Sequence, residues 1–211
     1  HPRLLGQGFF NPKDSILQAY VSISLIPIIR SFLYFKFKDL IFSGVSLGIA
    51  ISTKVVSIYL PFLFSFFYVL LSYYNNTSAK TIFKNLSLFH LFLLFFIFIF
   101  WPPWTNPIKS IIDIFIVLKQ YPFPGENFIL GEYISRFSLP WYYVPLWIGI
   151  TTPLTFITMF IIGLWENFKQ FTTKTTKKVC IDSFMLAGFV VPILSVIFLG
   201  STLYGGWRHM F

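Results

Sequence analysis

The apolar block at residues 40–73 decides the fold, and it reads LIFSGVSLGIAISTKVVSIYLPFLFSFFYVLLSY with Lys54 as its single charged residue. A helix rises about 1.5 Å per residue, so one helix over this block would be roughly 51 Å long. The hydrocarbon core of a bilayer is about 30 Å thick and needs about 20 helical residues. The block is therefore too long for one membrane span, and we predict two short helices, 40–53 and 55–73, with a break at Lys54.

The rest of the chain is also apolar. Of its 211 residues, 56% are hydrophobic and 11% are charged, whereas soluble domains carry about 25% charged residues. The run FHLFLLFFIFIFW at residues 89–101 has no polar face, which excludes both an amphipathic surface helix and an alternating strand. We predict an all-α fold, a polytopic transmembrane helical bundle that forms a single domain over residues 1–211.

Dividing the block at Lys54 gives six predicted spans, at residues 15–34, 40–53, 55–73, 86–101, 143–165 and 183–200. Lysines concentrate in the loops 35–39, 74–85 and 166–182, and six spans place all three loops on the cytoplasmic side, as the positive-inside rule requires. Five spans would put the two later loops outside. Membrane topology thus explains the formal charge of +9, and we expect no nucleic-acid partner.

The six-span topology places four segments on the non-cytoplasmic side, where we expect the function to lie: residues 1–14, the turn at Lys54, residues 102–142 and residues 201–211. Within the long outer segment, Asn106-Pro107 is typical of a helix start, and apolar residues then recur on one face. We predict an amphipathic helix in the interfacial plane. It either guides a lipid-linked substrate or serves as a plain connector.

Four stretches at the boundaries of the spans form an ordered pattern: HPRLLGQGFFNPKD at 1–14, SGVSLGIAISTK at 43–54, LPWYYVPLWIGITTPL at 139–154 and GWRH at 206–209. Together they cover the chain from its first residues almost to its last. In this order they resemble the membrane glycosyltransferases of the GT-C superfamily, specifically the bacterial relatives of dolichyl-phosphate-mannose protein mannosyltransferases.

The resemblance implies an inverting enzyme that takes a sugar from a polyprenyl-phosphate carrier and passes it to a lipid, glycan or protein acceptor. It also implies a bacterial inner-membrane location, with the active site facing the periplasm. The acidic catalytic residue of such families lies in the first outer loop, which would precede His1, so the catalytic residue stays unassigned. The chain begins at His1 rather than Met, and we expect an internal fragment that is inactive alone.

Four residues are candidates for binding the donor phosphate, because cations must meet the negative charge that the leaving phosphate carries. They are Arg3, Lys54 and Arg208, with His209 as a hydrogen-bond donor beside Arg208. A lysine well inside hydrocarbon costs about 2.5 to 3.5 kcal/mol, so Lys54 needs a partner unless it snorkels from a helix end. Arg208 follows two glycines that permit a tight turn, although it also suits an interfacial anchor.

Four further residues are candidates for a substrate or lipid groove. The rings of Trp141, Tyr142 and Tyr143 could stack on a sugar or line the path of the lipid, although residues of an aromatic belt look the same. Asp14 could assist the site, but it also suits a helix start beside the positive end of the helix dipole.

We expect no metal site in this chain, because its histidines lack paired ligand spacing and Cys180 has no nearby partner. No cofactor is expected, although a divalent cation could bind the upstream acidic loop. The expected partners are the lipid-linked sugar donor, its acceptor and membrane lipids. Two other readings remain open: a transporter or lipid flippase, whose charges should lie near the membrane midplane, and a non-catalytic scaffold.

Overall fold

The computed structural model describes residues 12–101, 125–173 and 177–200, together with isolated positions between 106 and 116. The chain divides into two compact units, one of His1–Thr105 with Thr176–Phe184 and the other of Asn106–Thr175 with Met185–Phe211. Apart from one two-stranded hairpin, the described elements are helices. The predicted all-α fold class is confirmed.

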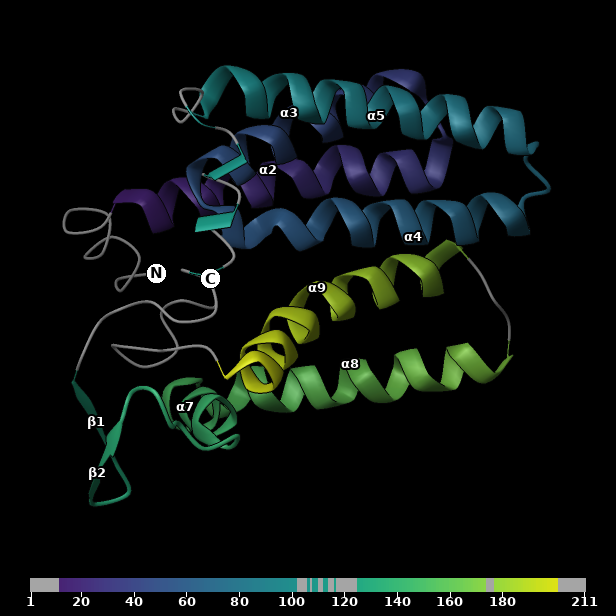
Figure 1. The fold of residues 1–211 in the computed structure, drawn as a ribbon. Helices are drawn as coiled ribbons and strands as arrows, with labels where there is room; N and C mark the ends of the chain where they lie inside the picture. The colour runs from purple at the N-terminus through teal and green to yellow at the C-terminus, as the bar shows by residue number, and fades with distance from the viewer. Residues whose placement is uncertain are drawn as a thin grey trace. The chain divides into compact units, whose positions relative to one another are not determined.

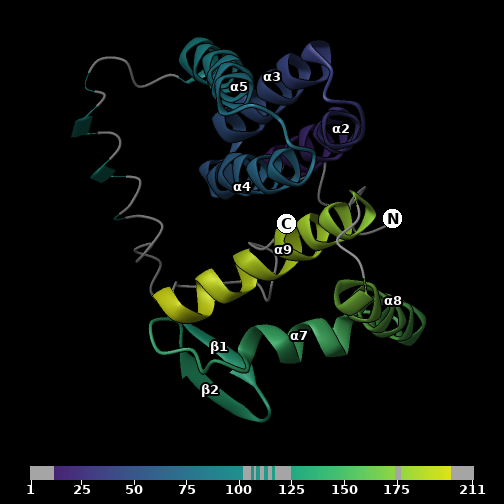
Figure 2. The ribbon, with the colours of Figure 1, turned by 90° about the vertical axis from the view of Figure 1, so that its right-hand side faces the viewer.

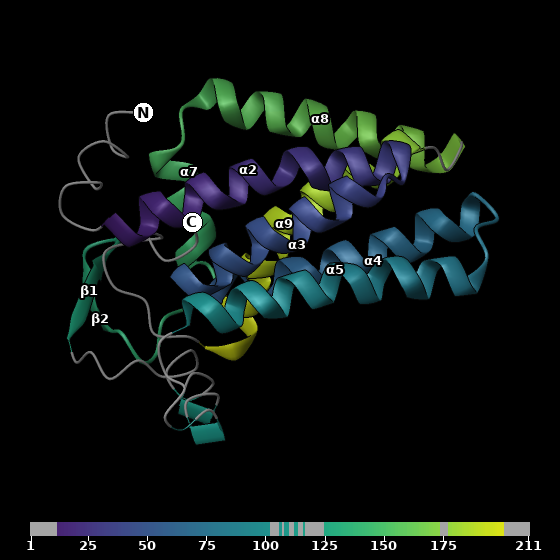
Figure 3. The same cartoon turned by 90° about the horizontal axis from the view of Figure 1, so that it is seen from above.

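Four helices build the first unit: α2 (Pro12–Tyr34), α3 (Phe37–Thr53), α4 (Tyr59–Tyr74) and α5 (Ala79–Phe100), joined by the first turns of α9 (Lys177–Leu199). In Figures 1 and 3, α2 and α4 run in one direction and α3 and α5 in the other. Successive helices of this unit are therefore antiparallel. Figure 2 looks along these helices and shows them gathered around a common centre.

The chain breaks at Lys54, as predicted from the length of the apolar block. α3 ends at Thr53, Lys54 is extended with φ −156° and ψ 116°, and the 3-10 helix η1 (Val55–Ile58) leads into α4. At the end of α3, the hydroxyl of Thr53 donates to the carbonyl of Ile49 at 2.9 Å.

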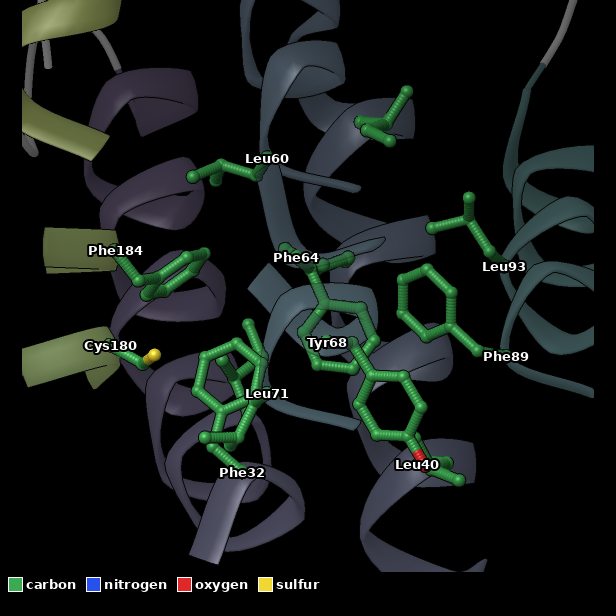
Figure 4. Packing of buried hydrophobic residues seen from close by; sticks show 13 residues of the cluster. Phe32, Leu40, Leu60, Phe64, Tyr68, Leu71, Phe89, Leu93, Cys180 and Phe184 are labelled. Atoms are coloured by element: carbon green, nitrogen blue, oxygen red, sulfur yellow. The ribbon is translucent and has the colours of Figure 1, made fainter. Parts of the chain in front are cut away.

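Aromatic rings fill the core of the first unit (Figure 4). Phe64 of α4 lies at its centre, with its ring centroid 5.4 Å from that of Phe32 and 4.5 Å from that of Phe89. Phe184, on the first turns of α9, meets Phe32 edge-on at 5.4 Å. Three of these rings come from helices far apart in the chain, so the core fixes α2, α4 and α5 against one another.

Two glycines let α3 and α5 approach closely. A Cβ atom added to Gly44 would lie 2.5 Å from the carbonyl oxygen of Phe89, and one added to Gly48 would lie 2.8 Å from that of Leu93. Small residues four positions apart are common where membrane helices pack backbone against backbone. The Gly-rich character of residues 43–54 thus has a packing explanation.

The second unit contains a β-hairpin, two helices and the rest of α9. The hairpin pairs β1 (Glu126–Ile129) with β2 (Glu132–Ser135) in antiparallel register, with Phe128 opposite Tyr133. Its two-residue turn has positive φ at both Leu130 (50°) and Gly131 (93°), which matches the right-handed twist of the strands. The hairpin was not predicted. The amphipathic helix predicted near residues 107–118 falls largely outside the described residues.

The predicted span 143–165 was wrong in its shape. It contains two helices, α7 (Tyr143–Thr151) and α8 (Leu154–Thr173), which are bent by 117° at the break between them. Thr152 is extended, with φ −91° and ψ 128°. Pro153 explains this, because a proline ring disfavours the helical conformation of the residue before it.

Four helices in the described part of the chain are long and apolar enough to cross a membrane, or up to five if the bent pair α7–α8 is one span. These helices indicate a membrane-embedded protein. The predicted count of six is not reproduced: α3, with 17 residues, is not among these four helices, whereas η1 and α4 count together as one run of 20 residues, Val55–Tyr74. Two predicted starts were also late: α5 begins at Ala79 rather than 86, capped by the Ser78 hydroxyl, and α9 begins at Lys177 rather than 183.

Candidate functional site

Lys54 and Asp14 form an ion pair in the first unit. The Nζ atom of Lys54 lies 2.8 Å from Oδ1 of Asp14, although the two residues are 40 positions apart. The side chain of Asp14 is 8% exposed and that of Lys54 is 26% exposed. Both residues were predicted as members of a site, but their pairing was not.

The antiparallel arrangement of the helices explains how the pair forms. Asp14 lies in the first turn of α2, and Lys54 lies at the break where the chain leaves α3 and enters η1. Because α3 returns antiparallel to α2, the end of α3 and the start of α2 share one end of the unit (Figure 3). The expectation that Asp14 lies at a helix start is confirmed. Lys54 forms its ion pair with Asp14 at this helix start.

The backbone around Lys54 is held in place from within. The carbonyl oxygen of Lys54 accepts hydrogen bonds from the amide of Ser57 at 3.2 Å and from its hydroxyl at 3.0 Å. Ser57 is 2% exposed, so these bonds are shielded from solvent. These bonds restrain the backbone at the break, and the side chain of Lys54 reaches Asp14 of α2 from there.

The electrostatics of this end favour an anion beside Lys54. A lysine ammonium has three N–H donors, and Asp14 accepts one of them at 2.8 Å. The helix α2 also begins here, at Pro12, and the first turn of a helix presents unbonded N–H groups and partial positive charge. The pair neutralises a lysine at low cost while leaving it able to contact a second acceptor.

The three aromatic residues of the predicted groove do not share one environment. Trp141 is 71% exposed and Tyr142 is 37% exposed, whereas Tyr143 is 2% exposed and packs with Ile129 and Val144 in the core of the second unit. The three rings therefore do not form one exposed stacking platform. The burial of Tyr143 follows from its place at the start of α7, on the side that faces the hairpin.

Trp141 and Tyr143 nevertheless line the same small hollow, with a volume of about 50 Å³. Its other walls are apolar side chains of the loop before α7, of α7 itself and of the end of α9: Phe137, Leu139, Pro140, Val144, Val196, Ile197 and Gly200. These side chains offer few hydrogen-bonding groups, although backbone groups make about half of the exposed lining polar.

Three of the predicted phosphate-binding residues, Arg3, Arg208 and His209, lie outside the described residues. No group of three or more His, Cys, Asp or Glu side chains that could hold a metal ion occurs among the residues that the structure describes. Asp14 is the acidic residue at the Lys54 end of the first unit, and it is already engaged by Lys54. Comparison with protein-family models, curated proteins and solved structures finds no match to this chain.

Proposed function

We propose that this chain is part of a membrane glycosyltransferase that moves a sugar, with inversion, from a polyprenyl-phosphate donor to an acceptor, and that Lys54 contacts the donor phosphate. The observation that carries the proposal is the Lys54–Asp14 ion pair, 2.8 Å long, at a break between two apolar helices. The pair keeps a charged lysine at that position without leaving it unpaired. The four-motif resemblance supplies the reaction class.

The chemistry of the transfer matches the electrostatics of this end. The carrier phosphate leaves with negative charge, and preorganised donors aimed at that charge stabilise the transition state. Lys54 offers such a donor, because its backbone is fixed by Ser57 and its ammonium is oriented by Asp14. Arg3, Arg208 and His209 remain sequence-based candidates for binding the donor phosphate. The general base is proposed to lie upstream of His1.

We propose six spans, which put the Lys54 end on the periplasmic side of a bacterial inner membrane. This count treats α3 as a span and the bent pair α7–α8 as another. The 17 residues of α3 give a length of about 25 Å, near the lower limit for crossing a bilayer. In support, α3 packs along α2 and α5 and runs from one end of the unit to the other (Figure 1).

The hollow beside Trp141 is proposed to hold part of the hydrocarbon carrier. The apolar side chains around it support this assignment, and Trp141, which lines it, is exposed. Tyr143 is assigned a packing role instead, because its ring is 2% exposed. The acceptor and the sugar itself are not assigned to residues of this chain.

A transporter or lipid flippase is the second candidate, and the bend of 117° between α7 and α8 favours it. Transporters place broken helices at their substrate sites. They also place charges near the membrane midplane, whereas Lys54 and Asp14 lie at the end of their helices. The position of the charged pair is the reason for preferring the transferase.

The deciding experiment measures sugar transfer by the full-length protein in membranes supplied with a radiolabelled polyprenyl-phosphate sugar. Lys54→Ala should reduce transfer at least tenfold while membrane abundance stays at the wild-type level. Lys13→Ala is the matched control, because Lys13 is an exposed lysine at the same end. Normal transfer by the Lys54 variant would remove Lys54 from the site. Movement of labelled lipid across proteoliposomes without any sugar transfer would favour the flippase.

A further inference from the structure

The end of the first unit opposite the Lys54–Asp14 pair, here called the basic end, collects exposed cations. It is made of the last two turns of α2, the start of α3, the end of α4 and the start of α5, which meet on one side in Figures 1 and 3, together with the first turn of α9. Its exposed cationic residues are Arg30, Lys36, Lys38, Lys80, Lys84, Lys177 and Lys178.

Few carboxylates balance this charge. Asp39 of α3 and Asp182 of α9 are the acidic residues of these helical ends, and neither is fully exposed. Asp39 is 5% exposed and its Oδ1 atom accepts from Nε of Arg30 at 2.9 Å, so its charge is already used inside the protein. The exposed surface of the basic end is therefore strongly positive.

The position of the lysines makes this charge mildly unfavourable, although Nζ of Lys177 donates to the carbonyl of Leu33 at 3.1 Å. Lys38, Lys80 and Lys177 each lie in the first turn of a helix, namely α3, α5 and α9. The first turn of a helix carries partial positive charge, which disfavours a cation by about 0.3 to 1 kcal/mol at exposed positions. α5 and α9 have no acidic residue in the first turn to offset it. A bound anion would relieve both the lysines and the helix starts.

Exposed aromatic rings alternate with the cations. Tyr34, Phe37, Tyr73, Tyr74 and Phe83 are each more than half exposed at the basic end. Two lysines contact rings directly: Nζ of Lys36 lies 5.5 Å from the centroid of Tyr34, and Nζ of Lys177 lies 5.7 Å from that of Phe35. Rings that are apolar on one side and polar on the other gather at the headgroup level of membranes.

We propose that the basic end binds the phosphate headgroups of anionic phospholipids in one membrane leaflet. The clustered cations supply the phosphate contacts, each worth about 1 kcal/mol near an anionic membrane surface. The exposed rings favour a lipid over a soluble polyanion, because they continue the apolar sides of the helices. The proposal requires the membrane location and does not depend on sugar transfer. The positive-inside rule accounts for the side on which this charge lies, and lipid binding is an additional property.

The test measures thermal unfolding of the full-length protein in nanodiscs of phosphatidylcholine alone and in nanodiscs that also contain phosphatidylglycerol. The wild-type midpoint should rise when phosphatidylglycerol is present. The variant Lys38→Gln/Lys80→Gln removes two first-turn lysines and should lose most of that rise. In phosphatidylcholine alone, the same variant should unfold at the wild-type temperature or above it, because two unfavourable charges have gone. This opposite response separates lipid binding from simple damage to the fold.

Two controls complete the design. Lys38→Arg/Lys80→Arg should keep the response to phosphatidylglycerol, and Lys13→Gln/Lys109→Gln removes two exposed lysines elsewhere and should keep it as well. Inorganic phosphate added to phosphatidylcholine nanodiscs should give no comparable rise. An equal rise with free phosphate, an equal response in both glutamine variants, or no response of the wild type would each overturn the proposal.

Discussion

Arg30 donates from Nε to Oδ1 of Asp39 at 2.9 Å, and this bond joins the last turns of α2 to the first turn of α3. A second ion pair, Lys54 with Asp14, joins the same two helices at their other end. An ion pair therefore links α2 to α3 at each end of the two helices. Between these two ion pairs, α2 and α3 contact each other through buried serines and apolar side chains.

Replacing Asp39 should remove the ion pair with Arg30 and lower the stability of the protein. Asp39→Ala removes both the bond to Arg30 and the favourable carboxylate in the first turn of α3, with an expected loss of about 1 kcal/mol of unfolding free energy. The expected loss of free energy is small because Arg30 is 54% exposed and solvent screens its ion pair with Asp39. Thermal unfolding in detergent measures it, with the exposed Asp113→Ala as control. Equal midpoints for the two variants would contradict a structural role for the bond.

Enlarging Gly44 should separate α3 from α5. In Gly44→Ala the new Cβ would lie 2.5 Å from the carbonyl oxygen of Phe89, and relieving that overlap should cost about 1 to 3 kcal/mol. Gly163→Ala in α8 is the matched control, because nothing lies within 4 Å of its Cβ position. Alanine is the better helix former, so the control should be neutral or stabilising. Gly44→Ala should therefore lower the unfolding midpoint, whereas Gly163→Ala should leave it unchanged or raise it. An equal loss in both variants would contradict the close approach.

Removing the central ring of the core should weaken the first unit. Phe64 is fully buried, so Phe64→Ala leaves a cavity among Phe32, Phe89 and Tyr68. In a membrane the transfer term vanishes, because lipid is as apolar as the core, and the cavity term of about 2 kcal/mol remains. Phe62→Ala on the same helix is the control, because Phe62 is 69% exposed. Comparable midpoints for these variants would show that Phe64 does not hold the helices together.

The topology can be tested with introduced cysteines. Cys180 is 6% exposed, so its thiol is a poor reporter, and Cys180→Ala gives a suitable background. Lys80→Cys and Glu132→Cys both lie at exposed positions. With six spans, an impermeant thiol reagent applied to intact cells should label the cysteine at 132 and leave the one at 80 unlabelled. The reverse pattern, or equal labelling, is incompatible with the proposed sides.

Sequence reasoning predicted a break because the apolar block is too long for one span, and the charge of Lys54 and the sides of the lysine-rich loops placed that break near Lys54. It missed the bend at Pro153, although this proline lies within the predicted span 143–165. The mean hydropathy of a span is hardly changed by one residue, even when that residue redirects the backbone. The hairpin was missed for a related reason: its turn is Leu130-Gly131 rather than an Asn-Gly pair, so the usual turn signal is weak.

The candidate site was predicted in part. Lys54 was singled out because a charge in an apolar block needs a partner, but the partner lies 40 residues away and is set by how α2 packs on α3. No local pattern encodes that distance. The sequence did not predict that Tyr143 is buried while Trp141 is exposed, because three consecutive aromatic residues give the same signal. Their environments differ only because α7 starts at Tyr143 and packs against the hairpin.

The unusual burial of α3 has a consequence for the order in which the protein is assembled. Nine of its 17 residues are buried: Asp39, Leu40, Ser43, Gly44, Ser46, Leu47, Gly48, Ala50 and Ile51. In α5, by contrast, Phe89 and Leu93 are the buried residues of a 22-residue helix. A short helix rich in serine and glycine gains little from lipid and much from its neighbours. We expect α3 to become stably inserted only once α5 has been synthesised, so truncation of the nascent chain before Ala79 should leave α3 accessible from the aqueous phase.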